Sequence, residues 1–247
     1  MTAGPVLILG ATSAIARAAA VAFAAKDYPL YLAGRDRDEL ERLAVDLNIR
    51  YGSDVRWGLF DAENFASHAA FVNDVQAEAG ALYGVLLAFG YLGDQQLAAH
   101  DARERELIIA RNLTGAVSIL EHCAHVLEQR RAGFIIAISS VAGDRGRQSN
   151  YLYGAAKGGL HIYLQGLRNR LFHAGVRVVT VKPGFVDTAM TFGRPRMFLL
   201  ARPEQVGQRI VAALARRADV IYVPWFWRYI MLAIRLLPET LFKRLKL

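Results

Sequence analysis

Short, nearly unbroken apolar runs alternate along this chain with longer segments in which apolar residues recur at helical spacing. The short runs are typical of buried strands and the amphipathic segments are typical of helices. The pattern predicts strands at Val6–Leu9, Leu30–Ala33, Val55–Phe60, Val85–Phe89, Gly133–Ser139, Val176–Val181 and Val220–Val223. It predicts helices at Ala14–Ala25, Asp38–Leu47, Ser67–Ala79, Arg103–Leu127, Tyr151–Phe172, Pro203–Arg216 and Trp225–Leu237, with a further basic segment at Leu241–Leu247.

This alternation of strands and helices predicts an α/β fold, with one parallel sheet of about seven strands and helices on both faces. The chain has 247 residues, which fits a single domain over residues 1–247 with a substantial core. No linker is long enough to mark a second domain, and we find no internal repeat.

The composition, 54% hydrophobic and 21% charged, is typical of a globular chain. Its one cysteine, Cys123, excludes an intramolecular disulfide and a cysteine-rich zinc site, and the histidines show no ligand spacing. The chain opens on a strand-like run without a basic leader, and every apolar stretch of about eighteen residues contains a charge. We therefore expect a cytoplasmic protein without a simple transmembrane helix.

The positive charge is concentrated at the carboxyl end. Residues 194–247 carry eleven Lys or Arg against three acidic residues, an excess of eight that equals the net charge of +8 of the whole chain. Such asymmetry indicates an anionic partner or surface at this end. No nucleic-acid recognition motif accompanies it, so nucleic-acid binding is not expected.

The stretch from Ile138 to Lys157 holds the residues with the clearest chemistry. Tyr153 and Lys157 are four residues apart, so on a helix they share a face. An ammonium beside the phenol is expected to lower a tyrosine pKa that is ordinarily about 10. Ser140, at the end of a predicted strand, can donate a hydrogen bond to a carbonyl oxygen on which negative charge develops. An isolated Tyr-x-x-x-Lys pair is common on helix surfaces; the order strand, serine, loop and helix favours a site.

A second candidate lies after the first strand. Gly10 is followed by Thr12, Ser13 and Ile15 where a dinucleotide-binding fold bends into its first helix, and backbone N–H groups there can receive a pyrophosphate. Ala14 and Ala16 stand where glycines are usual. A tight turn that binds no ligand would give the same pattern.

The end of the second strand bears on cofactor choice. Gly34 stands where an NAD-binding fold normally has a carboxylate for the ribose 2′-hydroxyl, and Arg35 follows. A guanidinium suits a 2′-phosphate, so NADP(H) is favoured over NAD(H). The alternative is that Arg35 and Arg37 only cap a solvated turn.

With these motifs in order, and with Asn112 and the run from Lys182 to Thr188, the chain resembles the short-chain dehydrogenase/reductase family over nearly its full length. The resemblance implies a Rossmann-type fold and hydride transfer with a nicotinamide cofactor. It implies that Tyr153 is the proton donor in reduction, that Lys157 lowers its pKa and holds the nicotinamide ribose, that Ser140 orients the carbonyl, and that Asn112 keeps a water in a proton relay. The cofactor-binding residues it implies are Gly10, Thr12, Ser13, Ile15, Arg35, Asp61, Ala62, Ala88, Gly90, Tyr153, Lys157, Pro183, Gly184, Val186 and Thr188.

One departure concerns the fourth strand, which ends Leu87-Ala88-Phe89-Gly90 where the family usually has Asn-Asn-Ala-Gly. The missing asparagine side chains would alter hydrogen bonding beside this strand, whereas the set of Asn112, Ser140, Tyr153 and Lys157 is complete.

Within the family, three runs are similar to the decaprenylphosphoryl-2-keto-erythro-pentose reductases, which complete the epimerisation of polyprenyl-phosphate ribose to arabinose. These runs are Ala88–Asp94, Asn112–Ser118 and Trp227–Leu247. The likeness implies a lipid-linked keto-sugar substrate. A free hydrophobic ketone or alcohol is the alternative substrate, and a non-catalytic NADP(H)-binding sensor is the alternative class; a sensor needs no proton donor.

Two segments of the carboxyl end bear on substrate and partners. Residues 189–203, where the family places a substrate lid, interleave apolar residues with arginines, which suits a hydrocarbon chain bearing a phosphate or simply a lid that packs on itself. Residues 225–247 form a basic, aromatic, amphipathic segment that can lie on an anionic membrane, at the inner face of the cytoplasmic membrane. It can equally cover the sheet or contact another subunit. The resemblance also implies a homodimer or homotetramer packed through Tyr151–Phe172.

Overall fold

The computed structural model describes residues 4–189 and 199–245. Seven parallel strands form one sheet in the order β3-β2-β1-β4-β5-β6-β7. The strands are β1 (Val6–Leu9), β2 (Leu30–Gly34), β3 (Val55–Leu59), β4 (Gly84–Leu87), β5 (Gly133–Ile138), β6 (Val176–Pro183) and β7 (Val220–Val223). The helices are α1 (Ala14–Ala24), α2 (Arg37–Tyr51), α3 (His68–Ala79), α4 (Gln95–His100), α5 (Ala102–Ile109), α6 (Gly115–Arg130), α7 (Tyr151–Phe172), α8 (Pro203–Ala215), α9 (Trp227–Leu236) and α10 (Glu239–Phe242).

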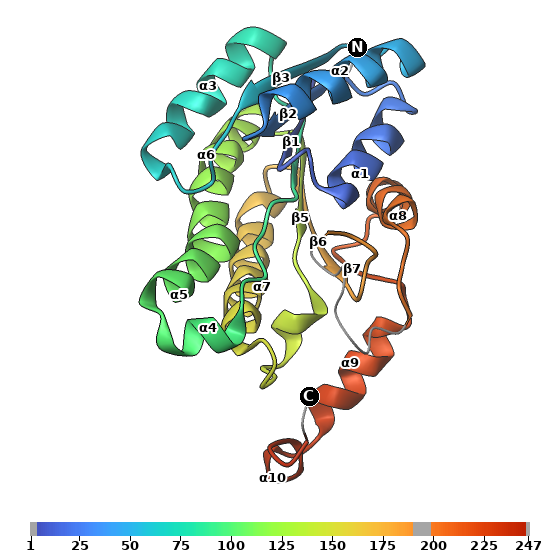
Figure 1. Ribbon diagram of the computed structural model, residues 1–247. Coiled ribbons are helices and arrows are strands. Elements are labelled where there is room, and N and C mark those ends of the chain that lie inside the picture. The colour runs from blue at the N-terminus through green and yellow to red at the C-terminus, as the bar shows by residue number, and fades with distance from the viewer. Residues whose placement is uncertain (1–3, 190–198, 246–247) are drawn as a thin grey trace.

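Helices cover both faces of the sheet (Figure 1). Side chains of a strand alternate between faces, so in β1 the buried residues Val6 and Ile8 pack with α1, α2 and α8. Leu7 and Leu9 pack on the opposite face with α3, α6 and α7. This double burial explains why the strands read as unbroken apolar runs. The predicted α/β class, parallel sheet and two helix layers are confirmed.

The helix predicted over Arg103–Leu127 is present, but it is not α-helical throughout. Two helices, α5 and α6, are joined by a π-helical turn at Ala110–Thr114, and the short helix α4 precedes them. The turn is held by Asn112, whose side-chain amide donates to the Ile108 carbonyl at 2.8 Å and whose Oδ1 accepts from Tyr91 N at 3.1 Å. The bond from Tyr91 comes from another segment of the chain, so helical periodicity alone could not reveal the π-helical turn.

The strand order reverses beside β1, which lies between β2 and β4. In a parallel sheet the loops leaving two such strands diverge and leave a crevice at their carboxyl ends. Ala88 N still donates to Leu9 O at 2.9 Å, so the ladder continues past β4 without the asparagine side chains usual there. The alteration expected at Ala88–Gly90 therefore does not interrupt this part of the sheet.

The carboxyl-terminal helices α9 and α10 extend beyond the rest of the molecule at one end (Figure 1). One side of α9 is buried: Trp227 is 2% exposed and Met231 is fully buried, and both pack with Val141. Arg145 holds the end of α9, donating to the carbonyls of Ile234 and Leu237, each at 2.6 Å. Part of the segment predicted to be amphipathic thus covers the protein itself.

No helix within residues 4–189 and 199–245 is long and apolar enough to span a membrane. The predicted substrate lid lies mostly outside the described residues, since 190–198 are not among them. The two flanks of that segment meet: Ala201 N donates to Phe185 O at 2.9 Å, and Asp187 N donates to Ala201 O at 3.0 Å.

Candidate active site

Two neighbouring cavities occupy the carboxyl ends of the strands, with volumes of about 360 and 500 Å³. Both are lined by Thr12, Ser13, Ala88, Phe89 and Gly90. The smaller cavity, here the Arg35 cavity, is also lined by Gly10, Gly34, Arg35, Asp36, Phe60, Asp61, Ala62, Glu63, Tyr91 and Arg111. The larger, here the Tyr153 cavity, is also lined by Ala14, Ile15, Arg17, Ile138, Ser139, Ser140, Tyr153, Lys157, Pro183, Gly184, Val186, Thr188 and Ala189. Every site residue expected from the sequence except Asn112 lines one of them.

The turn between β1 and α1 brings backbone close to both cavities. Gly10 has φ of 80°, and a Cβ there would lie 2.7 Å from the nitrogen of Phe89, so only glycine fits. Ser13 caps α1 by accepting from Ala16 N at 3.3 Å. The amino end of α1 thus lies where the two cavities meet, a position suited to a pyrophosphate.

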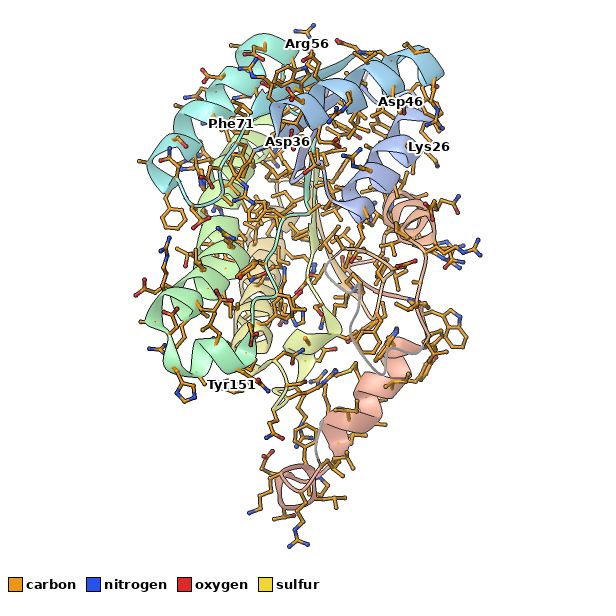
Figure 2. All side chains as sticks on the ribbon, viewed as in Figure 1. Lys26, Asp36, Asp46, Arg56, Phe71 and Tyr151 are labelled. Atoms are coloured by element: carbon orange, nitrogen blue, oxygen red, sulfur yellow. The ribbon has the colours of Figure 1, made fainter. Side chains whose placement is uncertain are left out.

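In the turn after β2, three consecutive polar residues make different contacts. Asp36, at the start of α2 (Figure 2), accepts from Glu39 N at 3.1 Å and caps that helix. Arg37 lies over the Trp57 ring, 5.3 Å from its centroid. Arg35 lines the Arg35 cavity, and so does Asp36. Capping and stacking are thus carried by Asp36 and Arg37, the two residues that follow Arg35.

Tyr153 and Lys157 lie one turn apart on α7 and are 8% and 2% exposed. Lys157 Nζ donates to the Ile138 carbonyl at 3.3 Å and lies 5.7 Å from the centroid of the Tyr153 ring. Ser140 follows β5, and its Oγ accepts from Ala142 N at 3.1 Å. Strand β5 and helix α7 therefore bring the three side chains, thirteen and four residues apart in sequence, to one cavity.

Burial shifts the pKa values of Tyr153 and Lys157. It raises the pKa of Tyr153 to about 12, while a hydrogen bond with Ser140 acts in the lowering direction. Burial also lowers the pKa of Lys157 to about 8. The expectation that Lys157 lowers the phenol pKa is thus not met in the protein alone, because desolvation disfavours both the phenolate and the ammonium. The phenol is protonated at neutral pH, the form that can donate a proton.

Asn112 lies behind this cavity and is 1% exposed. Its amide is bonded to the Tyr91 and Ile108 backbones, so its side chain fixes the loop after β4. A Cβ on Gly90 would lie 2.9 Å from Asn112 Oδ1 and 3.4 Å from Lys157 Nζ. The absence of a side chain at Gly90 therefore leaves the space between Asn112 and Lys157 open.

A buried polar cluster lies beside the Ser140 turn. The Asp144 side chain, 2% exposed, accepts from Lys182 Nζ at 2.5 Å and from the Tyr222 hydroxyl at 2.9 Å. His161 Nδ1, from α7, lies 3.5 Å from Asp144 Oδ1. One carboxylate therefore connects the Ser140 turn to α7, β6 and β7.

Sequence reasoning missed this cluster and several cavity residues, among them Phe89, Tyr91 and Arg111. One signal was present: His161 lies four residues after Lys157, on the same helix face. The other members come from separate elements, and nothing in their spacing links them. Among the described residues, no cluster of His, Cys, Asp or Glu could hold a metal ion.

Comparison with known proteins agrees with this arrangement. The family model described as short chain dehydrogenase matches residues 5–196. An uncharacterized oxidoreductase of Mycobacterium tuberculosis strain H37Rv is 37% identical over 243 residues, covering 98% of this chain and 97% of the relative. An uncharacterized oxidoreductase of Streptomyces coelicolor is 38% identical over 242 residues, covering 97% and 94%.

Solved structures share the fold. A short-chain dehydrogenase from Sphingobium yanoikuyae in complex with NADPH superposes with a TM-score of 0.80 at 25% identity, covering 90% of this chain and 88% of the other. A single-residue variant of actinorhodin polyketide ketoreductase, with NADPH, gives a TM-score of 0.81 at 19% identity, covering 90% and 95%.

Proposed function

Because the chain belongs to the short-chain dehydrogenase family, we propose that this oxidoreductase uses NADPH to reduce a ketone to an alcohol. The observation that carries the proposal is the placement of Ser140, Tyr153 and Lys157 on the same cavity as Ser13, at the amino end of α1. A proton donor and a dinucleotide-binding turn thus face one space. The two cavities suit the two halves of a dinucleotide, and their shared residues suit its pyrophosphate.

Bound in this way, the nicotinamide would supply a hydride to the carbonyl carbon of the substrate. Ser140 would donate a hydrogen bond to the carbonyl oxygen and hold it near Tyr153. Tyr153, kept protonated by burial, would transfer its phenolic proton to that oxygen as negative charge develops. Lys157 would then favour the resulting phenolate, and the gap at Gly90 leaves room for water between Lys157 and Asn112.

The preference for NADPH is supported by Arg35. Arg35 lines the cavity, and Gly34 presents no carboxylate to a ribose 2′-hydroxyl. Asp36 also lines this cavity, but its carboxylate caps α2 by accepting from Glu39 N. A 2′-phosphate would meet a cation at this wall, which stabilises it by charge-assisted hydrogen bonding. The Sphingobium yanoikuyae relative, described as a complex with NADPH, is consistent with this choice.

For the substrate, we propose a polyprenyl-phosphate-linked keto-sugar, as in the decaprenylphosphoryl-2-keto-erythro-pentose reductases. The support is the likeness of Ala88–Asp94, Asn112–Ser118 and Trp227–Leu247 to those reductases, together with the apolar and basic carboxyl end. A free hydrophobic ketone is the second candidate, because Ile138 and Val186 give the Tyr153 cavity an apolar wall.

An assay of NADPH oxidation against a substrate panel tests both proposals. The panel contains a polyprenyl-phosphoryl 2-keto-pentose, the same keto-pentose without lipid, and plain hydrophobic ketones. We expect the highest kcat/KM for the lipid-linked sugar, and Ser140→Ala should reduce it about a hundredfold or more. Equal turnover of plain ketones would support the second candidate. NADPH binding without turnover of any carbonyl would instead favour a cofactor-binding sensor.

We also propose that the protein self-associates through α7, the helix the family resemblance indicates. Ile162 and Phe172 on this helix are 69% and 72% exposed, which leaves apolar surface for a second copy. Light scattering on the purified protein should give a dimer or tetramer mass, and Ile162→Glu should lower it. A monomer in both cases would contradict the proposal.

A further inference from the structure

We propose that the outward side of α9 and α10 is a docking surface for anionic phospholipid membranes. This outer face is defined by Trp225, Arg228, Tyr229, Leu232, Arg235 and Leu236, continued by Leu241, Lys243, Arg244 and Leu245. The inference concerns where the protein resides and does not depend on the identity of its substrate.

The apolar residues of the outer face form one stripe. On α9, Tyr229, Leu232 and Leu236 are separated by three and four residues, the spacing of one side of a helix. Trp225 lies in the turn before α9, with its ring centroid 5.9 Å from that of Tyr229. The exposed fractions of Trp225, Tyr229, Leu232 and Leu236 are 68, 61, 52 and 73%. Aromatic and aliphatic side chains so exposed at one end of the molecule are typical of helices that lie in a membrane interface.

This stripe is not the side by which α9 packs on the protein. The packing side is Trp227 and Met231, which are buried against Val141, with Ile230 and Ile234 beside them. Both sides of α9 are therefore apolar, but only one has a partner within the described residues. Packing of α9 on the protein therefore does not account for the exposed apolar side chains of the outer face.

The basic residues beside the apolar stripe indicate that the surface it binds is anionic. Arg228 and Arg235 flank the stripe, and Lys243 and Arg244 are exposed farther along the same end. The acid nearest them in the sequence, Glu239, forms an ion pair with Arg145 at 2.9 Å and so is partly neutralised. Basic residues beside an apolar helix face attract anionic headgroups while the apolar side chains enter the acyl boundary.

A groove beside the start of α9 extends this positive surface. It has a volume of about 690 Å³ and is lined by Arg209 of α8, by Arg216 directly after α8, and by Trp225 and Arg228. No Asp or Glu is among its described lining residues. Such a groove suits the phosphates of lipid headgroups next to the inserted stripe.

A second copy of this chain is a poorer occupant of the same face. A two-fold symmetric contact centred on this face would bring the arginines of both copies into one interface. That arrangement costs energy because like charges repel where water is excluded.

Contacts from Arg145 hold α9 and α10 to the rest of the protein. Besides the α9 carbonyls, the Arg145 guanidinium binds Glu239 and lies 3.8 Å from the centroid of the Phe242 ring. Arg145 directly follows the turn that begins at Ser140. Docking through α9 would therefore bring the turn that bears Ser140 near the membrane in a defined orientation.

Vesicle flotation tests the inference with the full-length protein. Wild-type protein should float with phosphatidylcholine vesicles containing phosphatidylglycerol, much less with pure phosphatidylcholine, and less as salt increases. Arg228→Gln/Arg235→Gln should weaken partition roughly thirtyfold, because each basic residue near such a surface contributes about fivefold. Leu232→Glu/Leu236→Glu should abolish flotation, since both carboxylates would enter the interface.

Matched controls separate this surface from general charge and hydrophobicity. Lys26→Gln/Arg103→Gln removes the same charge from other exposed positions, and Ile49→Glu places a carboxylate at an apolar position that is 78% exposed on α2. Both should float as the wild type does, and the thermal unfolding midpoints of all variants should agree. The proposal is overturned if wild-type protein does not float. It is equally overturned if the outer-face variants float like the controls, or if they only convert a dimer to a monomer.

Discussion

Lys182 and Asp144 form a buried ion pair, with Nζ 2.5 Å from Oδ1 and side chains that are 11% and 2% exposed. Lys182 lies on β6 immediately before Pro183 and Gly184, which line the Tyr153 cavity, and Asp144 ends the turn that begins at Ser140. The pair thus joins two cavity walls that are thirty-eight residues apart in sequence. Tyr222 and His161 complete the surroundings of the carboxylate.

Asp144→Asn should lower the free energy of unfolding by about 3–5 kcal/mol, because it leaves the Lys182 ammonium buried without its counter-charge. Urea unfolding measures this loss. Asp144→Asn/Lys182→Met removes both charges and should recover most of the stability. Tyr222→Phe, which deletes only one hydrogen bond, should cost about 1 kcal/mol. An Asp144→Asn protein as stable as the wild type would contradict the proposed importance of the pair.

Tyr153→Phe should reduce NADPH oxidation by about 10²–10⁴-fold, since the phenolic proton donor is removed while the ring remains. NADPH affinity, followed by fluorescence titration, should change little. Tyr151→Phe is the matched control, because Tyr151 is 47% exposed two residues earlier on the same helix. Unchanged turnover in Tyr153→Phe would refute the assigned acid.

Arg35→Ala should weaken NADPH binding roughly ten- to hundredfold, the effect of losing a charge-assisted hydrogen bond to phosphate. NADH binding should be nearly unaffected. Arg37→Ala serves as the control, because Arg37 lies over Trp57 and not at the cavity. Titration of each variant with both cofactors makes the comparison, and equal losses for NADPH and NADH would count against a 2′-phosphate contact.

Acid should destabilise the protein through His161. Burial, then the Lys182 charge, lowers the pKa of His161 from 6.5 to about 4; the Lys157 charge acts in the same direction, while Asp144 and the Ser140 backbone act against it. As pH falls from about 6.5 to 4, the unfolded chain binds a proton that the folded protein does not, so stability decreases, by up to roughly 3 kcal/mol. Urea unfolding of His161→Gln should show a shallower decline over this window, and an identical pH dependence would remove His161 as its source.

Much of the architecture could be predicted because its signals are local. All seven strands were predicted to within two residues at either end. The signal is strongest in the middle of the sheet, where β1, β4 and β5 are buried and apolar. Helix α7 was predicted at both ends. The candidate site followed from residue types at fixed spacing around Tyr153 and Gly10, and the cavities contain all but one of those residues.

The sequence pattern failed where a residue acts on a distant segment. Asn112 lies in a π-helical turn of the expected long helix, where its amide binds Tyr91 in another loop. The raised pKa of Tyr153 also depends on burial, which the Tyr-x-x-x-Lys spacing does not report.

By itself, then, the sequence determined where strands and helices follow one another along the chain, the family resemblance and the set of polar residues available for chemistry. Only the tertiary structure decided which charges are buried together, as at Asp144, Lys182 and His161, and which side of α9 is covered. The physical reason is that periodicity records how a residue fits its own helix or strand. Desolvation and ion pairing depend on partners that separate elements bring into contact.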